Sequence, residues 1–99
     1  MNVTLLYFNG CPNWQQTEQR LLHALDQAGL APTVLTRQAV ETPEAAERLR
    51  FRGSPTVLVN GHDPFADPNA PVGLSCRIFQ TPDGLAGAPT VEQLLAVLR

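Results

Sequence analysis

The chain has 99 residues, of which 43% are apolar and 16% are charged, and its net charge at neutral pH is −2. This length and this apolar content suit one hydrophobic core, so we expect a single domain over residues 1–99. No apolar stretch approaches the ~20 residues of a membrane span, and the seven basic residues are dispersed. We therefore expect neither a membrane partner nor a nucleic-acid partner.

The chain contains two cysteines, Cys11 and Cys76. Two cysteines are too few for a disulfide-rich secreted scaffold, and residues 1–8 lack the basic start and long apolar run of a secretory signal. The sequence therefore predicts a cytoplasmic protein with reduced thiols. No cofactor is expected, because the sequence contains neither a phosphate-binding glycine loop nor the ligand spacing of a known divalent metal site.

The first two predicted elements are a strand and a helix. Residues 3–8 form a short apolar run with β-branched and aromatic members, which is typical of a buried strand. Residues 13–28 place apolar side chains on one helical face, with Asn13 as a candidate N-cap and Gly29 just beyond the end.

Two further strands and a short helix are predicted in the middle of the chain. Residues 33–36 and residues 56–59 are short apolar runs that favour strands. Between them, Thr42 supplies a hydroxyl cap and Pro43 suits the first helical position. The helix that they begin is expected to end near Arg50.

The last third of the chain predicts a loop, a strand and a terminal helix. Residues 61–73 are rich in proline and glycine and are expected to form a loop ordered by packing of Phe65. Residues 74–79 are the fourth strand candidate, and residues 81–89 read as irregular. Thr90 and Gln93 form a capping-box pattern before an apolar helix.

The predicted order, β-α-β-α-β-β-α, indicates an α/β fold with a four-stranded mixed sheet flanked by helices. The first strand–helix–strand unit favours parallel pairing with a right-handed crossover. The last two strands, residues 56–59 and 74–79, are expected to pair as an antiparallel hairpin with an unusually long connection.

Two short motifs resemble the thioredoxin-like family. Cys11-Pro12 lies directly between a predicted strand and a helix, and residues 53–56, Gly-Ser-Pro-Thr, lead into a later strand. In thioredoxin-like proteins a proline at the second place is cis and faces the reactive cysteine. The resemblance therefore implies a thioredoxin-like fold, in which Cys11 is the reactive thiol and a cis Ser54–Pro55 peptide lies beside it.

The chain departs from a redox Cys-x-x-Cys motif at its fourth position, which is Trp14. A narrower resemblance links Gly-Cys-Pro-Asn-Trp at residues 10–14 and Ser-Cys-Arg at residues 75–77 to the catalytic domain of organomercurial (alkylmercury) lyases. In those lyases two separated cysteines and one aspartate handle the metal and the carbon–mercury bond. Cys11 and Cys76 match the two cysteines, but Trp14 stands where the lyases have the aspartate, so we do not expect carbon–mercury cleavage.

The chemistry expected of the two cysteines differs. Cys11 precedes a helix whose unpaired N–H groups favour a thiolate, so it is a candidate nucleophile or soft-metal ligand rather than an inert buried thiol. In a strand of alternating faces, Cys76 and Ile78 point one way and Arg77 and Phe79 the other. Cys76 is then either a core residue or a partner of Cys11, as a disulfide or as a two-thiolate metal pair.

The leading prediction is a thiol protein in which Cys11 carries out thiol–disulfide exchange, with Cys76 or an external thiol as the resolving group. Its substrate would be a protein or small-molecule thiol or disulfide. The expected substrate-binding residues are Trp14, Ser54 and Pro55. The alternative is a module that binds a soft metal ion (mercury, copper or zinc) through Cys11 and Cys76 without turnover, and a third interpretation keeps the fold without thiol chemistry.

Overall fold

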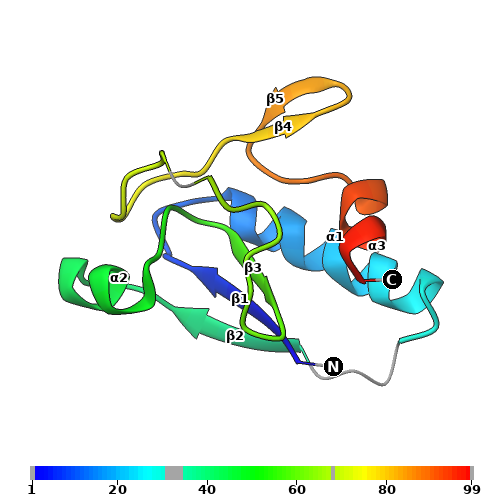
Figure 1. Cartoon of the computed structure of the whole chain (residues 1–99), viewed down its shortest axis with the longest axis horizontal. Coiled ribbons are helices and arrows are strands. Elements are labelled where there is room, and N and C mark those ends of the chain that lie inside the picture. Colours follow the sequence, from blue (N-terminus) through cyan, green and yellow to red (C-terminus); the bar gives the residue numbers. More distant parts are fainter. Residues whose placement is uncertain (1, 31–34, 68, 99) are drawn as a thin grey trace.

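In the computed structural model of the chain, the described residues are 2–30, 35–67 and 69–98. These residues form three helices, a three-stranded sheet and a separate two-stranded sheet, a small mixed α/β arrangement (Figure 1). The elements in chain order are β1 (Val3–Tyr7), α1 (Asn13–Gln27), β2 (Leu35–Ala39), α2 (Pro43–Leu49), β3 (Thr56–Val59), β4 (Phe79–Thr81), β5 (Gly84–Ala86) and α3 (Val91–Leu98).

The main sheet has the strand order β2-β1-β3. β1 and β2 are parallel, with Val3 opposite Leu35, which confirms the pairing predicted for the first strand–helix–strand unit. β3 is antiparallel to β1, with Val3 opposite Val59. The second strand was expected at residues 33–36; residues 33 and 34 lie outside the described residues, and the strand is seen from Leu35 to Ala39.

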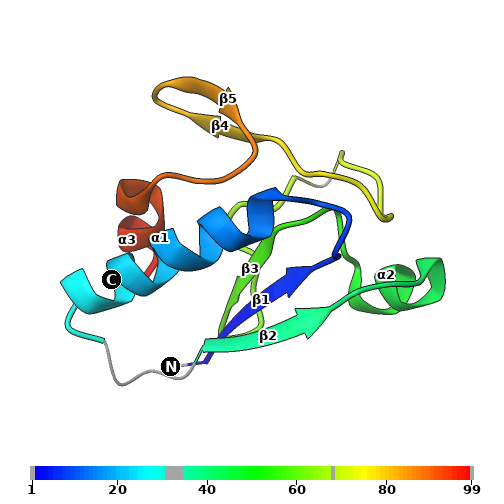
Figure 2. The same cartoon turned by 180° about the vertical axis from the view of Figure 1, so that it is seen from behind.

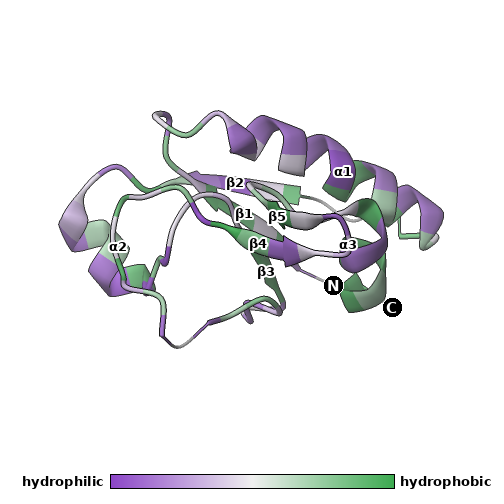
Figure 3. Ribbon diagram, turned by 90° about the horizontal axis from the view of Figure 1, so that it is seen from above, coloured by the Kyte–Doolittle hydropathy of each residue, from purple (hydrophilic) through white to green (hydrophobic). Residues whose placement is uncertain are grey.

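The core lies on both faces of β1 because successive side chains of a strand point to opposite sides. Val3 and Leu5 face α1 and α3, whereas Leu6 faces the other side of the sheet. The view from the back shows α1 running along the sheet (Figure 2), and the view from above shows hydrophobic residues on β3 and α3 (Figure 3). The first cluster contains Val3, Leu5, Leu21, Ala24, Leu25, Val57, Leu94 and Leu98. The second contains Leu6, Val40, Ala46 and Phe51.

The helix ends test the predicted caps. Thr42 Oγ1 accepts a hydrogen bond from the backbone N–H three residues on, at 3.1 Å, so the predicted cap of α2 is confirmed. The capping box of α3 is also confirmed: the backbone N–H of Thr90 donates to Gln93 Oε1 at 2.9 Å, and the N–H of Gln93 donates to Thr90 Oγ1 at 3.1 Å. The prediction for α1 is wrong, because its N-cap is Pro12 and Asn13 is already helical.

The predicted four-stranded sheet is wrong for the described residues. The expected strand at 74–79 does not pair with β3; its last residue begins β4, which pairs with β5 in a separate hairpin. The physical reason is local. Gly84 has φ of 105°, a conformation that glycine adopts readily, and it closes a tight turn between β4 and β5. A short turn brings its strands together at a smaller entropic cost than the long connection from β3.

The loop that follows β3 is tied to the core by Phe65. Phe65 packs against the first core cluster, as expected of the residue that orders the loop. Within the described ranges, none of the helices combines the length and the hydropathy needed to cross a bilayer.

Candidate functional site

Cys11 is fully buried between the end of β1 and the start of α1. Its backbone N–H donates to Phe8 O at 3.2 Å, which closes the turn after the strand. Its Sγ donates to the carbonyl oxygen of Ser54 at 3.3 Å.

The Ser54–Pro55 peptide is cis and lies beside Cys11, as the resemblance implied. Both residues are buried. The N–H of Ser54 donates to Ser75 O at 2.8 Å, and its carbonyl accepts from the N–H of Arg77 at 2.9 Å. The backbone of Ser54 is therefore already paired with the 75–77 segment. Ser54 thereby holds the segment that carries Cys76, and the substrate-binding role expected of Ser54 and Pro55 stays a prediction.

Gly53 allows this segment to approach closely. Its φ is 120°, a conformation that other residues rarely adopt. A Cβ at this position would lie 3.0 Å from Arg77 Cβ and 3.1 Å from Ser75 O. The close approach of residues 75–77 to the loop before β3 therefore depends on glycine.

Cys76 lies opposite Ser54 in an isolated parallel bridge, and its side chain is exposed. Because Cys11 Sγ donates to the carbonyl of the same Ser54, both cysteines adjoin this residue. Hydrogen bonding with Cys11 first, then desolvation and the charge of Cys11, raise the pKa of the Cys76 thiol above its usual value. The interpretation of Cys76 as a core residue is wrong, because its side chain is exposed, and its partnership with Cys11 stays a prediction.

The predicted alternation around Cys76 is confirmed, since Cys76 and Ile78 are exposed whereas Arg77 and Phe79 are buried. Both cysteines are free thiols. Two thiols next to one residue can form a disulfide or share a soft cation if their sulfurs meet. The structure thus brings together two residues that are far apart in the sequence.

Arg77 is the residue that the sequence analysis missed. Its side chain is 8% exposed, and its guanidinium donates to Asp63 Oδ2 at 2.6 Å, to Thr56 Oγ1 at 3.4 Å and to the carbonyl oxygen of Phe65. It also lies 4.8 Å from the centroid of the Phe79 ring. These contacts tie the long loop and the Cys76 segment to β3. An inward-facing arginine on an apolar strand was the available signal, because it requires an acidic partner nearby.

Trp14 packs on the sheet. Its ring stacks on Tyr7, with 4.3 Å between centroids and 28° between planes, and the Arg37 guanidinium lies 5.5 Å above it. Trp14 also packs against the first core cluster. These contacts are those of a structural residue that fixes the first turn of α1, which follows Cys11.

Comparison with known proteins gives no significant match: no family model matches the chain, and neither the curated proteins nor the solved structures contain a similar one. Any functional proposal for this chain therefore depends on the two cysteines and their surroundings. In residues 2–30, 35–67 and 69–98, no group of three or more His, Cys, Asp or Glu side chains is arranged to hold a metal ion.

Proposed function

We propose that this chain is a thioredoxin-like thiol protein in which Cys11 and Cys76 form a redox-active pair that exchanges disulfides with its substrate. Ser54 links the two cysteines, and this arrangement carries the proposal: its carbonyl accepts from Cys11 Sγ at 3.3 Å, and its backbone is bridged to Cys76. The parallel β1–α1–β2 unit and the proline loop beside Cys11 support the thioredoxin-like assignment.

The burial of the two thiols favours an order of events. Cys76 is exposed and Cys11 is not, so a substrate disulfide reaches Cys76 first. The sequence analysis assigned the first attack to Cys11; the proposal gives that step to Cys76 and makes Cys11 the resolving thiol. Because the pKa of Cys76 is raised, its thiolate fraction increases as the pH rises above neutrality. The rate of its attack on a disulfide should increase with that fraction.

The reaction proceeds in two exchanges. The Cys76 thiolate attacks one sulfur of the substrate RS–SR′, forms the Cys76–S–S–R bond and expels R′S⁻. The Cys11 thiolate then attacks Cys76 Sγ, forms the Cys11–Cys76 disulfide and expels RS⁻. The protein loses two protons and two electrons, which the two product thiols take up. A small dithiol, or two monothiols, returns the pair to its reduced form by the reverse steps.

The test is to oxidise the protein with a small disulfide and to map the products by mass spectrometry without reduction. The wild type should release two thiols and form one internal Cys11–Cys76 disulfide. Cys11→Ser should stop at a mixed disulfide on Cys76, whereas Cys76→Ser should react slowly because Cys11 is buried. A wild type that accumulates the mixed disulfide and never closes the internal bond would contradict the proposal.

A second function, binding of a soft metal ion without turnover, is favoured by one observation. Both cysteines adjoin Ser54, and the described ranges hold no cluster of three ligands, which suits a cation that accepts two thiolates. Titration with Cu(I), Hg(II) and Zn(II) tests it. One equivalent of a soft ion should protect both thiols from alkylation, and the protein should then show no catalytic turnover of a disulfide. Protection by none of the ions would exclude this function.

A further inference from the structure

Exposed apolar side chains surround Cys76. Leu74 and Ile78 lie two residues before and after it, and Ile78 is 68% exposed. Leu85, on the neighbouring β5, is 75% exposed. Because side chains two residues apart in an extended segment share a face, Cys76 and Ile78 lie on one side of the segment. The Cys76 thiol therefore lies among exposed apolar side chains, and we call Leu74, Ile78 and Leu85 the apolar stripe.

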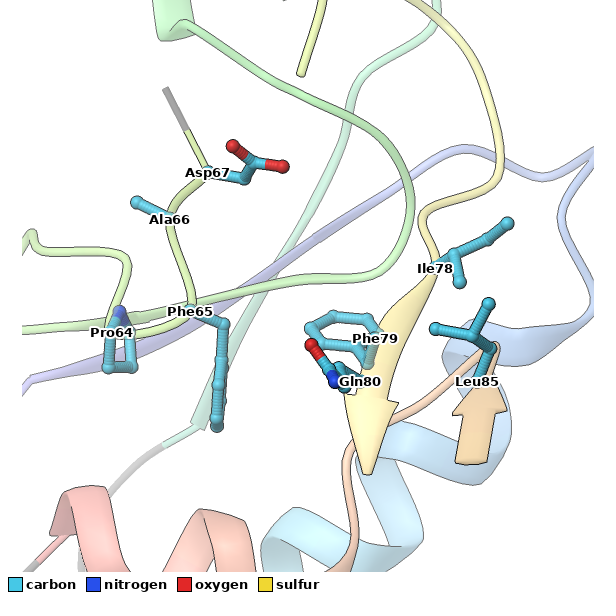
Figure 4. A pocket seen from close by; sticks show the side chains of 8 residues that line it. All are labelled: Pro64, Phe65, Ala66, Asp67, Ile78, Phe79, Gln80 and Leu85. Atoms are coloured by element: carbon cyan, nitrogen blue, oxygen red, sulfur yellow. The ribbon is translucent and has the colours of Figure 1, made fainter. Parts of the chain in front are cut away.

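A pocket of about 480 Å³ opens next to this stripe. Figure 4 shows Ile78 and Leu85 on one side and the 64–67 segment on the other. The rings of Phe65 and Phe79 meet edge to face with 5.6 Å between centroids. The lining residues are Pro64, Phe65, Ala66, Asp67, Ile78, Phe79, Gln80 and Leu85. Five of these are large apolar residues or proline, and the single charge among the eight is the Asp67 carboxylate.

The backbone of the Cys76 segment has one occupied edge and one outward edge. Ser75 O and the N–H of Arg77 both bond to Ser54, at 2.8 and 2.9 Å. In an extended chain the N–H and C=O of the intervening residue point the opposite way. No backbone hydrogen bond ends on Cys76 within the described ranges. An extended peptide can therefore pair with this edge, as in strand addition.

We propose that the pocket beside Ile78 is a subsite for an aromatic or large aliphatic side chain of an extended peptide, two residues from the cysteine whose disulfide reacts with Cys76. This inference rests on the proposed function, whose substrate class it names. A strand advances about 3.3 Å per residue, so a peptide side chain two positions along lies opposite Ile78 when the peptide cysteine lies opposite Cys76. The Asp67 carboxylate on the pocket selects a neutral or basic peptide over an acidic one.

The experiment uses short cysteine peptides activated as 2-thiopyridyl disulfides, whose reaction with the protein releases a coloured thione. Four peptides are compared: phenylalanine two residues from the cysteine, glycine there, phenylalanine one residue away, and the first peptide with an added glutamate. Burial of one phenylalanine side chain predicts a rate about tenfold higher for the first peptide than for the glycine peptide. The other two should react more slowly than the first.

Variants of the pocket provide the second arm. Leu85→Ser and Ile78→Ser should reduce the phenylalanine-to-glycine rate ratio to near one. Leu22→Ser is the matched control, because Leu22 is also an exposed leucine, 44% accessible, but lies on α1. It should keep the ratio of the wild type.

Two failures are distinguishable. Equal rates for the phenylalanine and glycine peptides in the wild type, or a ratio that survives both pocket substitutions, would overturn the subsite. A wild type that forms no internal disulfide, even with a small disulfide, would instead overturn the proposed function and the inference with it.

Discussion

Replacing Asp63 by asparagine is expected to destabilise the fold and to loosen the segment that carries Cys76. The carboxylate of Asp63 accepts from both terminal nitrogens of Arg77, at 2.6 and 3.4 Å. Both side chains are largely shielded from water, with 8% of Arg77 and 17% of Asp63 exposed. Asparagine keeps the size of the side chain but removes the charge that compensates the guanidinium.

The magnitude follows from the partners that remain. Removing one partner of a fully buried ion pair costs about 3–5 kcal/mol, because the other charge is left uncompensated. Arg77 keeps its bonds to the Phe65 carbonyl and to Thr56 Oγ1, and it keeps the Phe79 ring. The expected loss is therefore about 2–3 kcal/mol of unfolding free energy, or roughly 10–20 °C in Tm for a domain of this size.

Urea unfolding measures this loss, and the chain supplies its own control. Arg37 and Glu18 form a second arginine–carboxylate pair at 3.0 Å, in which Arg37 is 53% exposed. An exposed pair contributes about 0–1 kcal/mol, so Glu18→Gln should cost far less than Asp63→Asn. Amide hydrogen exchange at Arg77 should also accelerate in Asp63→Asn. Equal costs for the two substitutions would refute the assignment of Arg77 and Asp63 as the anchor of the site.

Three further predictions concern the thiols and the local structure. Cys11→Ala removes the hydrogen bond and the charge that raise the pKa of Cys76, so the midpoint of Cys76 alkylation against pH should fall; an unchanged midpoint would contradict the contact. Gly53→Ala places a Cβ against Arg77 in a strained conformation, so it should cost about 1–3 kcal/mol in urea unfolding and slow internal disulfide formation; a wild-type rate of closure would count against the role of Gly53. Thr42→Ala removes the cap of α2 and should cost about 1 kcal/mol, whereas Thr42→Ser should retain most of it.

Local signals in the sequence were enough for the elements whose ends depend on nearby residues. Thr42 and Thr90 cap the helices that their sequence patterns predicted, because each cap bond joins residues only three positions apart. The run at Val3–Tyr7 was recognisable as a strand from its apolar and β-branched side chains, although its hydrogen bonds go to distant residues. The cis peptide beside Cys11 agrees with a family resemblance rather than with any local propensity.

The tertiary structure alone decided how the last third of the chain is placed. The turn before Gly84 draws β4 and β5 into their own hairpin, so residues 74–78 meet the main sheet only through the bridge between Ser54 and Cys76. That bridge places Cys76 beside Ser54, whose carbonyl accepts from Cys11, and the buried pair of Arg77 and Asp63 holds the segment there. A pattern along the chain cannot specify such contacts, because their free energy depends on burial, and burial exists only after distant segments have packed together.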